Sequence, residues 1–416
     1  MNQPVGRRKF LGRLGSYGAA AAAGISWSGC AGTPPRKPAP PHPLTTISGT
    51  PRERGRQYGR AFRDPIRSFL DTEIYQTFTR VSSDSSAAFS DAGVYGEIYV
   101  PPKKPPTRDD LLRFAGACAK EIRAYSPTIH EELEGMAEGT GLRLEEIVLV
   151  TLHEELGHGG ALPHVDHCTA IAAGPPDTAD GHTYVGQNWD WMESVHGLSS
   201  MLLWKRPEGP SVLAYSYPGL WAGAGMNSAG VALCWTSGAG LGIPGPRVGI
   251  PSYVLIAQML YQDSLQAAVE EARRAKHAGW FVFVLADGEG RLANVEGTPR
   301  QLAVEFSRGH VARWLYGTAE LTRRPDGQTA RRHPRCQRMY DLLGGSKGRL
   351  DRERLQRCFA DHQSDGKAWS TVCTHFDQGA ASGTVDSMLF DTTKREAYVT
   401  RGPACSARWK TFRFDG

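Results

Sequence analysis

The chain of 416 residues lacks both a hydrophobic run long enough to cross a bilayer and an excess of charge over most of its length. Residues 14–27 form a weakly apolar stretch of 14 residues, whereas a transmembrane helix needs about 20. Four of the 48 basic residues lie in the first 30 positions, which contain no acid, so the rest has 44 basic against 43 acidic residues. These absences argue against an integral membrane protein and against a nucleic-acid-binding protein.

Internal repeats and closely spaced cysteine pairs are also absent, which argues against a zinc knuckle or a redox motif. His153 and His158 enclose a His-Glu-Glu-Leu-Gly-His segment, but their spacing is five, and a zinc helix needs histidines at i and i+4. We therefore expect neither a metal nor a cofactor. Cys373 and Cys405 are a candidate disulfide pair, and buried free thiols are the alternative.

The N-terminal 45 residues resemble a targeting segment followed by a linker. Residues 1–30 contain Arg7-Arg8-Lys9-Phe10-Leu11, which is typical of a twin-arginine export signal. They end at Cys30, which would be lipidated and anchored to a membrane if this is a lipoprotein signal, and removed otherwise. Residues 31–45 are rich in proline and predict a stiff spacer. We expect an exported protein that is periplasmic or membrane-anchored in the cell envelope.

Residues 46–416 are predicted to form one domain, because 40% of the chain is hydrophobic and 22% is charged, as in globular proteins. Apolar spacing predicts helices near 58–69, 107–125, 127–138, 252–261 and 264–276. Short β-branched and aromatic runs predict strands near 169–172, 182–187, 198–204, 211–217, 231–236, 281–286, 292–295 and 302–306. Asp180-Gly181 indicates a hairpin turn between the first two strands. This order indicates an α+β fold built from hairpins.

Three residues, Cys168, Asn188 and Asp190, form a candidate site for nucleophilic catalysis. Cys168 directly precedes the first predicted strand, and Asn188 and Asp190 directly follow the second. If the two strands pair as a hairpin, Asn188 and Asp190 return to the neighbourhood of Cys168. A cysteine thiol needs a base to become a good nucleophile, and His182 lies at the opposite end of the hairpin. The α-amine of Cys168 itself, with a pKa near 8 once the chain is cut before it, is the alternative base.

Several separate segments resemble the acyl-coenzyme A:6-aminopenicillanic acid acyltransferase family, a branch of the N-terminal-nucleophile hydrolases. The likeness extends from about residue 46 to the C-terminal end, and the order of its segments makes it specific. The matching segments are Ser48-Gly49-Thr50-Pro51, Gly55-Arg56-Gln57-Tyr58-Gly59, Glu131-Glu132-Leu133-Glu134-Gly135-Met136-Ala137-Glu138-Gly139, Cys168-Thr169, Gln187-Asn188-Trp189-Asp190, Gly225-Met226-Asn227-Ser228-Ala229-Gly230-Val231, Asp361-His362 and Gly402-Pro403-Ala404-Cys405.

The resemblance implies a four-layer αββα sandwich made as an inactive precursor that cuts itself between His167 and Cys168. The Cys168 thiol would attack the carbonyl of His167, and the resulting ester would be hydrolysed. The products would be a chain ending at His167 and one of 249 residues beginning at Cys168. The same thiol would then act on a small-molecule acyl amide or thioester through an acyl-enzyme, with no cofactor.

The resemblance also assigns roles to further residues. Asp190 would orient the freed α-amine, with Asn188 beside it. Asn227 and the backbone near Thr236 are candidate oxyanion donors. Arg335 resembles the family's late arginine. Trp189, Trp191, Trp221 and Trp235 either line an acyl pocket or belong to the core.

Three positions depart from the family pattern: His167 replaces a small glycine, Thr236 replaces an asparagine, and Trp314 stands where a side-chain oxyanion donor is common. They define the alternative hypothesis, a catalytically impaired envelope binding protein on the same fold. Within the enzyme hypothesis we expect hydrolysis rather than transfer from coenzyme A, because an exported enzyme meets water more readily than a cytosolic thioester.

Overall fold

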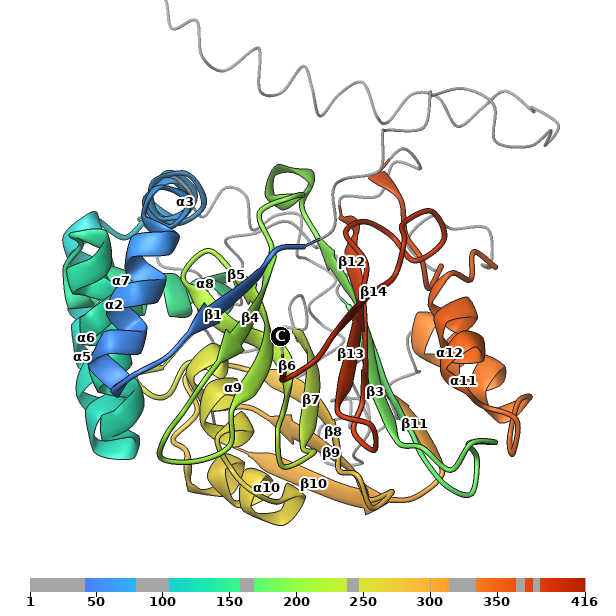
Figure 1. The fold of residues 1–416 in the computed structure, drawn as a ribbon. Helices are drawn as coiled ribbons and strands as arrows, with labels where there is room; N and C mark the ends of the chain where they lie inside the picture. Colours follow the sequence, from blue (N-terminus) through green and yellow to red (C-terminus); the bar gives the residue numbers. More distant parts are fainter. Residues whose placement is uncertain are drawn as a thin grey trace, which may run out of the picture.

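The described part of the chain consists of two β-sheets that face each other, with helices on both outer sides (Figure 1). The computed structural model describes residues 42–79, 105–157, 168–237, 247–299, 301–313, 334–363, 371–376 and 382–415. This arrangement confirms the predicted α+β class and the four-layer αββα sandwich. The predicted signal at 1–30 lies outside the described residues. Strand β1 begins at Leu44, two residues before the predicted start of the domain.

The larger sheet has eight described strands in the order β1-β4-β5-β6-β7-β8-β9-β10. Neighbouring strands are antiparallel except β1 and β4, which pair in parallel. The strands are β1 (Leu44–Ile47), β4 (Ser200–Trp204), β5 (Val212–Tyr217), β6 (Leu220–Asn227), β7 (Ala232–Ser237), β8 (Phe281–Ala286), β9 (Leu292–Gly297) and β10 (Leu302–Ser307).

The smaller sheet has six described strands in the order β11-β2-β3-β12-β13-β14, all antiparallel to their neighbours. Its central strands β2 and β3 lie against β7 and β8 of the larger sheet. The strands are β2 (Thr169–Ala173), β3 (Tyr184–Trp191), β11 (His310–Arg313), β12 (Gly383–Asp391), β13 (Glu396–Val399) and β14 (Lys410–Phe412).

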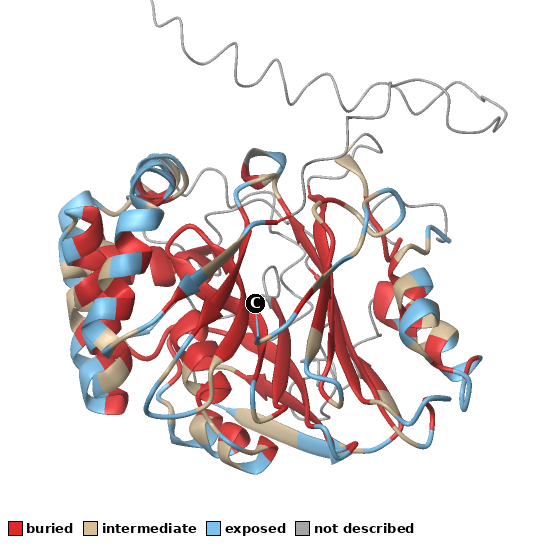
Figure 2. Ribbon diagram, viewed as in Figure 1, coloured by how far each residue is buried: buried red, intermediate tan, exposed pale blue. Residues whose placement is uncertain are grey.

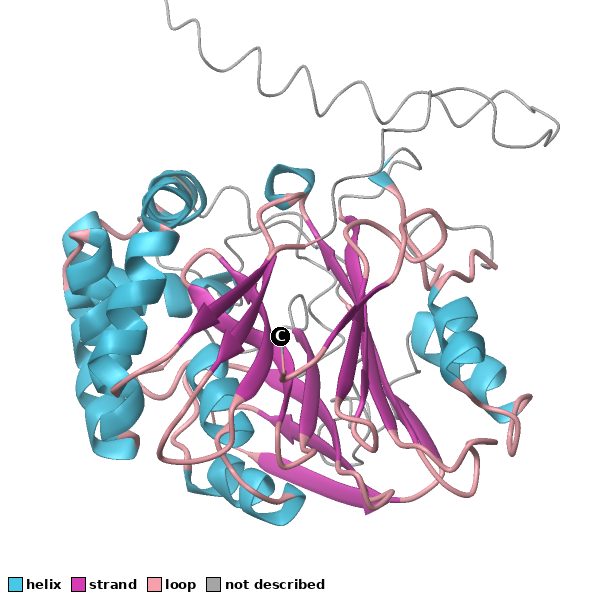
Figure 3. Cartoon of the chain, viewed as in Figure 1, coloured by secondary structure: helices cyan, strands magenta, loops and turns pink. Residues whose placement is uncertain are grey.

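Helices cover the outer faces of both sheets (Figure 3). Those on the side of the larger sheet are α2 (Pro51–Ala61), α3 (Arg63–Phe69), the π-helix η1 (Leu70–Tyr75), α4 (Gln76–Phe78), α5 (Arg108–Tyr125), α6 (Pro127–Thr140), α7 (Leu144–Thr151), α8 (His153–Leu156), α9 (Ser252–Leu260) and α10 (Leu265–Arg274). Those on the smaller sheet are α11 (Pro334–Gly344) and α12 (Arg352–Phe359), and a 3-10 turn, η4 (Glu193–Val195), follows β3.

The core lies mainly between the sheets and under the first helical layer, and Figure 2 shows both sheets buried along most of their strands. A second apolar cluster fills the space between the smaller sheet and helices α11 and α12, where Phe359 and Leu389 are fully buried. Among the described residues, none of the helices combines the length and the apolar character that crossing a bilayer requires.

Most predicted elements are present, and the differences have local causes. Strand β6 was missed because it contains two glycines, which weaken a strand pattern. A Cβ at one of them, Gly223, would lie 3.0 Å from the Trp189 indole, so its absence lets the two sheets approach. Strands β2 and β3 pair as predicted, but residues 174–183 connect them rather than a two-residue turn at Asp180-Gly181.

Glycines in two of the family-like segments bring helices α2 and α6 into backbone contact. A Cβ on Gly55 would lie 1.9 Å from the carbonyl oxygen of Glu132, and one on Gly135 would lie 2.1 Å from the carbonyl oxygen of Arg52. Gly139 also lies inside α6 and packs against α2 in the same way. The helix ends at Gly141, whose φ of +71° is the left-handed conformation that glycine favours.

Substituting alanine for Gly55 should therefore destabilise the protein, because the two helices must separate to admit the methyl group. We expect a loss of about 2 kcal/mol or more in the free energy of unfolding, measured by urea denaturation. Gly116→Ala is the matched control, because a Cβ there meets only Glu145 Cγ at 3.4 Å. Alanine in that helix should be neutral or stabilise by up to about 1 kcal/mol. Equal stability of the two variants would contradict the close-contact explanation.

Candidate functional site

Cys168 lies at the start of β2, where the pairing of β2 with β3 brings the end of β3 beside it. Thr169 pairs with Asn188, so the register places Cys168 next to the segment that ends in Asp190. The Cys168 thiol donates a long hydrogen bond to the backbone carbonyl of Asp190, with Sγ and O 3.9 Å apart. Its side chain is 4% exposed. The predicted neighbourhood of Cys168, Asn188 and Asp190 is thus formed by strand pairing.

The surroundings of Cys168 oppose ionisation of its thiol. Burial raises the pKa of the thiol to about 12, and the charge of Asp190 acts in the same direction. Hydrogen bonds with the Asp190 backbone and the Gln187 side chain lower the pKa by less. In this uncut chain the thiol is therefore protonated at neutral pH, and it needs a base to react.

The carboxylate of Asp190 is fully buried and is held by donors from two distant segments. Its Oδ2 accepts a hydrogen bond from Arg335 Nη1 at 2.5 Å, and its Oδ1 accepts one from Thr384 Oγ1 at 2.6 Å. Arg335 is fully buried near the start of α11, and Thr384 lies in β12, which pairs with β3. Two predicted site residues, Asp190 and Arg335, therefore form a direct ion pair. Thr384 was not predicted, because no local pattern marks a threonine 194 positions away.

Asn188 is buried and uses both ends of its side chain to tie β3 to neighbouring segments. Its Nδ2 donates to the carbonyl oxygens of Phe359 and Val372, each at 2.9 Å, and its Oδ1 accepts from Ser387 Oγ at 2.7 Å. These contacts lie on the face of β3 that carries the Asp190 carboxylate, since alternate residues of a strand share a face. Asn188 therefore positions the end of β3 from the side of α12.

Gln187 connects the two sheets on the other face of β3. Its Oε1 accepts a hydrogen bond from the backbone nitrogen of Trp235 at 3.0 Å, across the interface between the sheets. Its side chain also contributes to the electrostatic environment of the Cys168 thiol. Gln187 belongs to one of the family-like motifs, but no role was predicted for it. The available signal was a polar residue shortly after the apolar run Tyr184-Val185, at a position where glutamine is rarely buried.

Asn227 is not brought together with Cys168. Its Nδ2 donates to the carbonyl oxygens of Leu260 and Gln262, and its Oδ1 accepts from the Val231 nitrogen, so it closes the turn after β6. These carbonyls belong to the C-terminal end of α9, whereas the Cys168 charge is felt at Tyr253, at the N-terminal end. Seven residues of helix separate the two ends by roughly 10 Å. The side chain of Asn227 is thus committed to a structural turn.

The other predicted positions near the site are buried or lie outside the described residues. Thr236 is fully buried in β7. The four tryptophans proposed for an acyl pocket are at most 4% exposed and pack as core, for example Trp189 against Trp235 with ring centroids 5.8 Å apart. His167 and Trp314 fall outside the residues that the structure describes.

Residues 153–157, the described part of the His-Glu-Glu-Leu-Gly-His segment, make packing contacts and hydrogen bonds. The ring of His153 packs edge-on against Trp191, with centroids 5.0 Å apart. Glu154 accepts from the Tyr253 hydroxyl at 3.2 Å, and Glu155 accepts from the Ser252 hydroxyl at 2.6 Å. Burial raises the pKa of Glu155. These contacts join α8 to the start of α9.

The candidate disulfide is absent from the structure. All seven cysteines of the described residues are free thiols, Cys373 and Cys405 included. The prediction that Cys373 and Cys405 lie close together is confirmed. Instead of a bond between the sulfurs, the ring nitrogen Nε2 of His375 lies within 3.8 Å of both.

A comparison with known proteins finds the family that the sequence motifs resemble. The family model described as acyl-coenzyme A:6-aminopenicillanic acid acyl-transferase matches residues 177–402, which is more than half of the chain. The 40 kDa form of acyl-coenzyme A:6-aminopenicillanic-acid-acyltransferase of Emericella nidulans is 24% identical over 369 residues, covering 86% of this chain and 92% of that protein.

Solved structures also match this chain. The penicillin V acylase of Agrobacterium tumefaciens has a TM-score of 0.38 and 12% identity, covering 59% of this chain and 86% of its own. A variant of the conjugated bile acid hydrolase of Clostridium perfringens has a TM-score of 0.38 and 14% identity, covering 59% of this chain and 97% of its own.

The buried ion pair between Asp190 and Arg335 should contribute to the stability of the protein. Arg335→Met leaves the Asp190 carboxylate buried without its cation, and we expect a loss of about 3–5 kcal/mol in the free energy of unfolding. Adding Asp190→Asn should restore part of that loss, because the uncompensated charge is then gone. Arg338→Met on the same helix is the control.

Arg338 pairs with Asp361 at a partly exposed position, so its loss should cost no more than about 1 kcal/mol. Urea denaturation of the wild type and the three variants measures these differences. A double variant as unstable as Arg335→Met alone would contradict a charge-based cause.

Proposed function

The chain belongs to the acyl-coenzyme A:6-aminopenicillanic acid acyl-transferase family, and on this premise we propose that it is a self-processing cysteine amidohydrolase. The family makes it an enzyme of acyl transfer or amide hydrolysis. We propose further that Cys168 is the nucleophile, that the chain is cut between His167 and Cys168, and that water is the acyl acceptor. The observation that carries this proposal is the buried contact of Cys168 with the end of β3, where Arg335 and Thr384 fix the Asp190 carboxylate.

The high pKa of the Cys168 thiol supports an α-amine as the base. A thiol with a pKa of about 12 cannot ionise by itself at neutral pH. An α-amine has a pKa near 8, and cleavage would create one on the same residue as the thiol. The anchored Asp190 carboxylate is a suitable partner for the ammonium form of that amine, since an opposite charge stabilises it.

In the proposed cleavage, the Cys168 sulfur attacks the carbonyl carbon of His167 as the thiol proton leaves. The bond from that carbon to the Cys168 nitrogen breaks, the nitrogen takes up a proton, and a thioester remains. Water then hydrolyses the thioester. This step gives a carboxylate at His167, the free thiol and the free α-amine of Cys168.

In turnover, the α-amine takes the thiol proton and the sulfur attacks the carbonyl carbon of the substrate amide. The amine of the substrate leaves with that proton, and an acyl-enzyme remains on Cys168. Water attacks the acyl group, again with the α-amine as base, and the thiol is regenerated. Because the side chain of Asn227 is committed to a turn, backbone N–H groups near Thr236, other than that of Trp235, which donates to Gln187, are the oxyanion donors that we favour.

The substrate we propose is a small-molecule acyl amide in the cell envelope. The paired arginines at positions 7 and 8 and the proline-rich segment at 31–45 support export by the twin-arginine route, with Cys30 as a candidate membrane anchor. An enzyme in that compartment meets water and amides more readily than acyl-coenzyme A. Hydrolysis is therefore favoured over transfer.

Self-processing is tested by intact mass and N-terminal sequencing of the purified protein. We expect a chain of 249 residues that begins Cys-Thr-Ala-Ile and is absent from the Cys168→Ala variant. Cys234→Ala is the matched control, because Cys234 is a buried thiol whose pKa is raised well above its usual value by burial and by the nearby Cys168. It should still be cut.

A single uncut chain in every sample would remove the proposed base, and the alternative of an envelope binding protein would then be preferred. A set of N-acyl amines, assayed with and without acyl-coenzyme A, separates hydrolysis from transfer. Product formation only with the thioester would contradict the hydrolase proposal.

The proposed role of Asp190 in turnover is tested by changing Thr384, whose hydroxyl donates a hydrogen bond to the Asp190 carboxylate. Thr384→Val removes the hydrogen bond to Asp190 Oδ1 with little change of volume, whereas Thr384→Ser retains it. Hydrogen bonds to charged groups contribute about 1.5–3 kcal/mol, so valine should lower kcat by about ten- to a hundredfold. Serine should stay close to the wild type. Equal rates for the valine and serine variants would show that the orientation of Asp190 does not limit turnover.

A further inference from the structure

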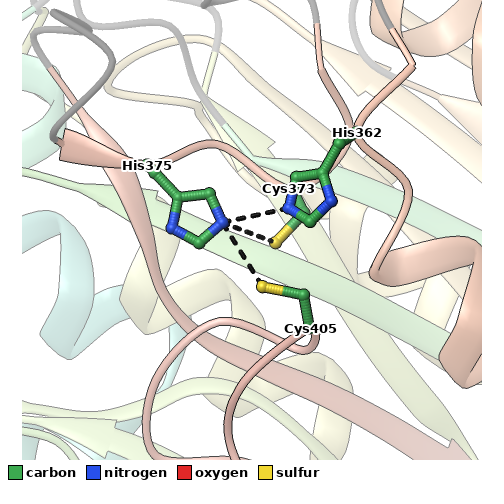
Figure 4. A group of neighbouring side chains, drawn as sticks. All are labelled: His362, Cys373, His375 and Cys405. Carbon is green, nitrogen blue, oxygen red and sulfur yellow. Dashed lines mark hydrogen bonds between the residues drawn. The ribbon is translucent and has the colours of Figure 1, made fainter. Parts of the chain in front are cut away.

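Four potential metal ligands converge at the surface beside the smaller sheet, outside the site described above. They are His362, Cys373, His375 and Cys405, and their ligand atoms all lie within 4.8 Å of one another (Figure 4). His362 follows α12, Cys373 and His375 lie in the segment 371–376, and Cys405 lies in the loop after β13. Three separate parts of the chain therefore contribute to one cluster.

The contacts centre on a single ring nitrogen. His375 Nε2 lies 3.0 Å from His362 Nε2, 3.3 Å from Cys405 Sγ and 3.8 Å from Cys373 Sγ. A ring nitrogen carries either one proton or one lone pair, so it cannot form three hydrogen bonds of this kind at once. Hydrogen bonds therefore cannot satisfy all three contacts of this nitrogen at once, whereas a cation shared by the four side chains accounts for all of them.

The spacing agrees with tetrahedral zinc. Zinc–nitrogen bonds of about 2.0–2.1 Å and zinc–sulfur bonds of about 2.3 Å separate tetrahedral ligand atoms by about 3.3–3.8 Å. The contacts of His375 Nε2, from 3.0 to 3.8 Å, bracket this range. The other ligand atoms lie within 4.8 Å of one another, so zinc binding would draw the widest pair together by up to about 1 Å.

We propose that His362, Cys373, His375 and Cys405 form a structural zinc site. Two thiolates and two imidazoles favour Zn²⁺ over Mg²⁺ or Ca²⁺, which prefer oxygen ligands. Four protein ligands fill the tetrahedral shell and leave no position for substrate, so the metal holds the fold rather than performs chemistry. This inference goes beyond the proposed function and does not depend on it.

The ligands are held by a hydrogen-bonded scaffold. The backbone nitrogen of Cys373 donates to the carbonyl oxygen of Asp361, whose carboxylate accepts two hydrogen bonds from Arg338. The Thr371 hydroxyl donates to the carbonyl oxygen of Cys373 at 2.9 Å. In the third segment, the backbone nitrogen of Ala407 donates to Pro403 and closes a turn around Cys405. These contacts join the segments that carry His362 and Cys373, and shape the loop that carries Cys405, without a metal.

The proposed site would stabilise the segment that supports the end of β3. Val372, one residue before a ligand, accepts the hydrogen bond from Asn188. Thr374, one residue after it, donates its backbone N–H to Thr384 Oγ1 and accepts from the Thr384 backbone N–H, and Thr384 is the residue whose hydroxyl donates to Asp190. Zinc would thus fasten the loop after β13 to the segment on which the site residues rest.

The test measures the zinc content of the purified full-length protein by elemental mass spectrometry. We expect one zinc per chain, lost in His362→Ala and in Cys405→Ser. Cys118→Ala is the matched control, since Cys118 is a buried cysteine of α5, far from the cluster in the fold, and it should retain the metal. Because His362 and Cys405 are exposed, their substitution should leave the protein folded.

Two further measurements keep the proposal testable if a variant is unstable. Protein produced in cobalt-containing medium should show the visible absorption of a tetrahedral cobalt–thiolate centre, and a chelator should lower the melting temperature of the wild type but not of Cys405→Ser. Alkylation of the cysteines without a reductant tests for the competing explanation, a disulfide between Cys373 and Cys405. A protein without zinc in which Cys373 and Cys405 resist alkylation until reduced contains a disulfide, and the proposal is then wrong. Zinc retained in both ligand variants would also overturn it.

Discussion

The candidate site depends on one electrostatic constraint, the burial of the Asp190 carboxylate without contact with water. A buried charge is tolerated only when it is paired and hydrogen-bonded, and Arg335 and Thr384 meet that requirement. Arg335 belongs to α11 and Thr384 to β12. Because both bind the Asp190 carboxylate, they hold the end of β3 between that helix and that strand. Cys168, paired beside that end, takes its position from the same constraint.

The same principle organises the helical layer on the other side of the molecule. Arg54 of α2 and Glu132 of α6 form a fully buried ion pair at 2.7 Å. Trp204 of β4 and the Tyr261 hydroxyl at the end of α9 donate to the Glu132 carboxylate. Because glycines let α2 and α6 touch, this pair sits where both helices meet the sheet. The family-like segments at 55–59 and 131–139 thus contribute close helix packing and, through Glu132, buried charge. Cys168-Thr169 and Gln187-Asn188-Trp189-Asp190 contribute the site.

Asn188 shows how a residue near the site can serve it indirectly. Its side chain reaches Phe359 at the end of α12 and Val372 in the segment that carries Cys373 and His375. The four-residue cluster at the surface and the buried end of β3 are therefore connected through one amide. A metal in that cluster would reinforce the positioning of the site without contacting substrate.

The sequence by itself determined what short-range patterns encode. Apolar periodicity and β-branched runs predicted the α+β class and the elements β2–β5, β7–β10, α5, α6, α9 and α10, but not β1, β6, β11–β14, α7, α8, α11 or α12. The strand pattern around Cys168 also predicted the nearness of Cys168 to Asp190, since a hairpin brings its two ends together. Only the tertiary structure decided that Thr384 binds Asp190, that Asn227 closes a turn, and that residues 362, 373, 375 and 405 meet. These contacts join positions far apart in the chain, and the packing of layers that brings them together leaves no local periodicity to detect.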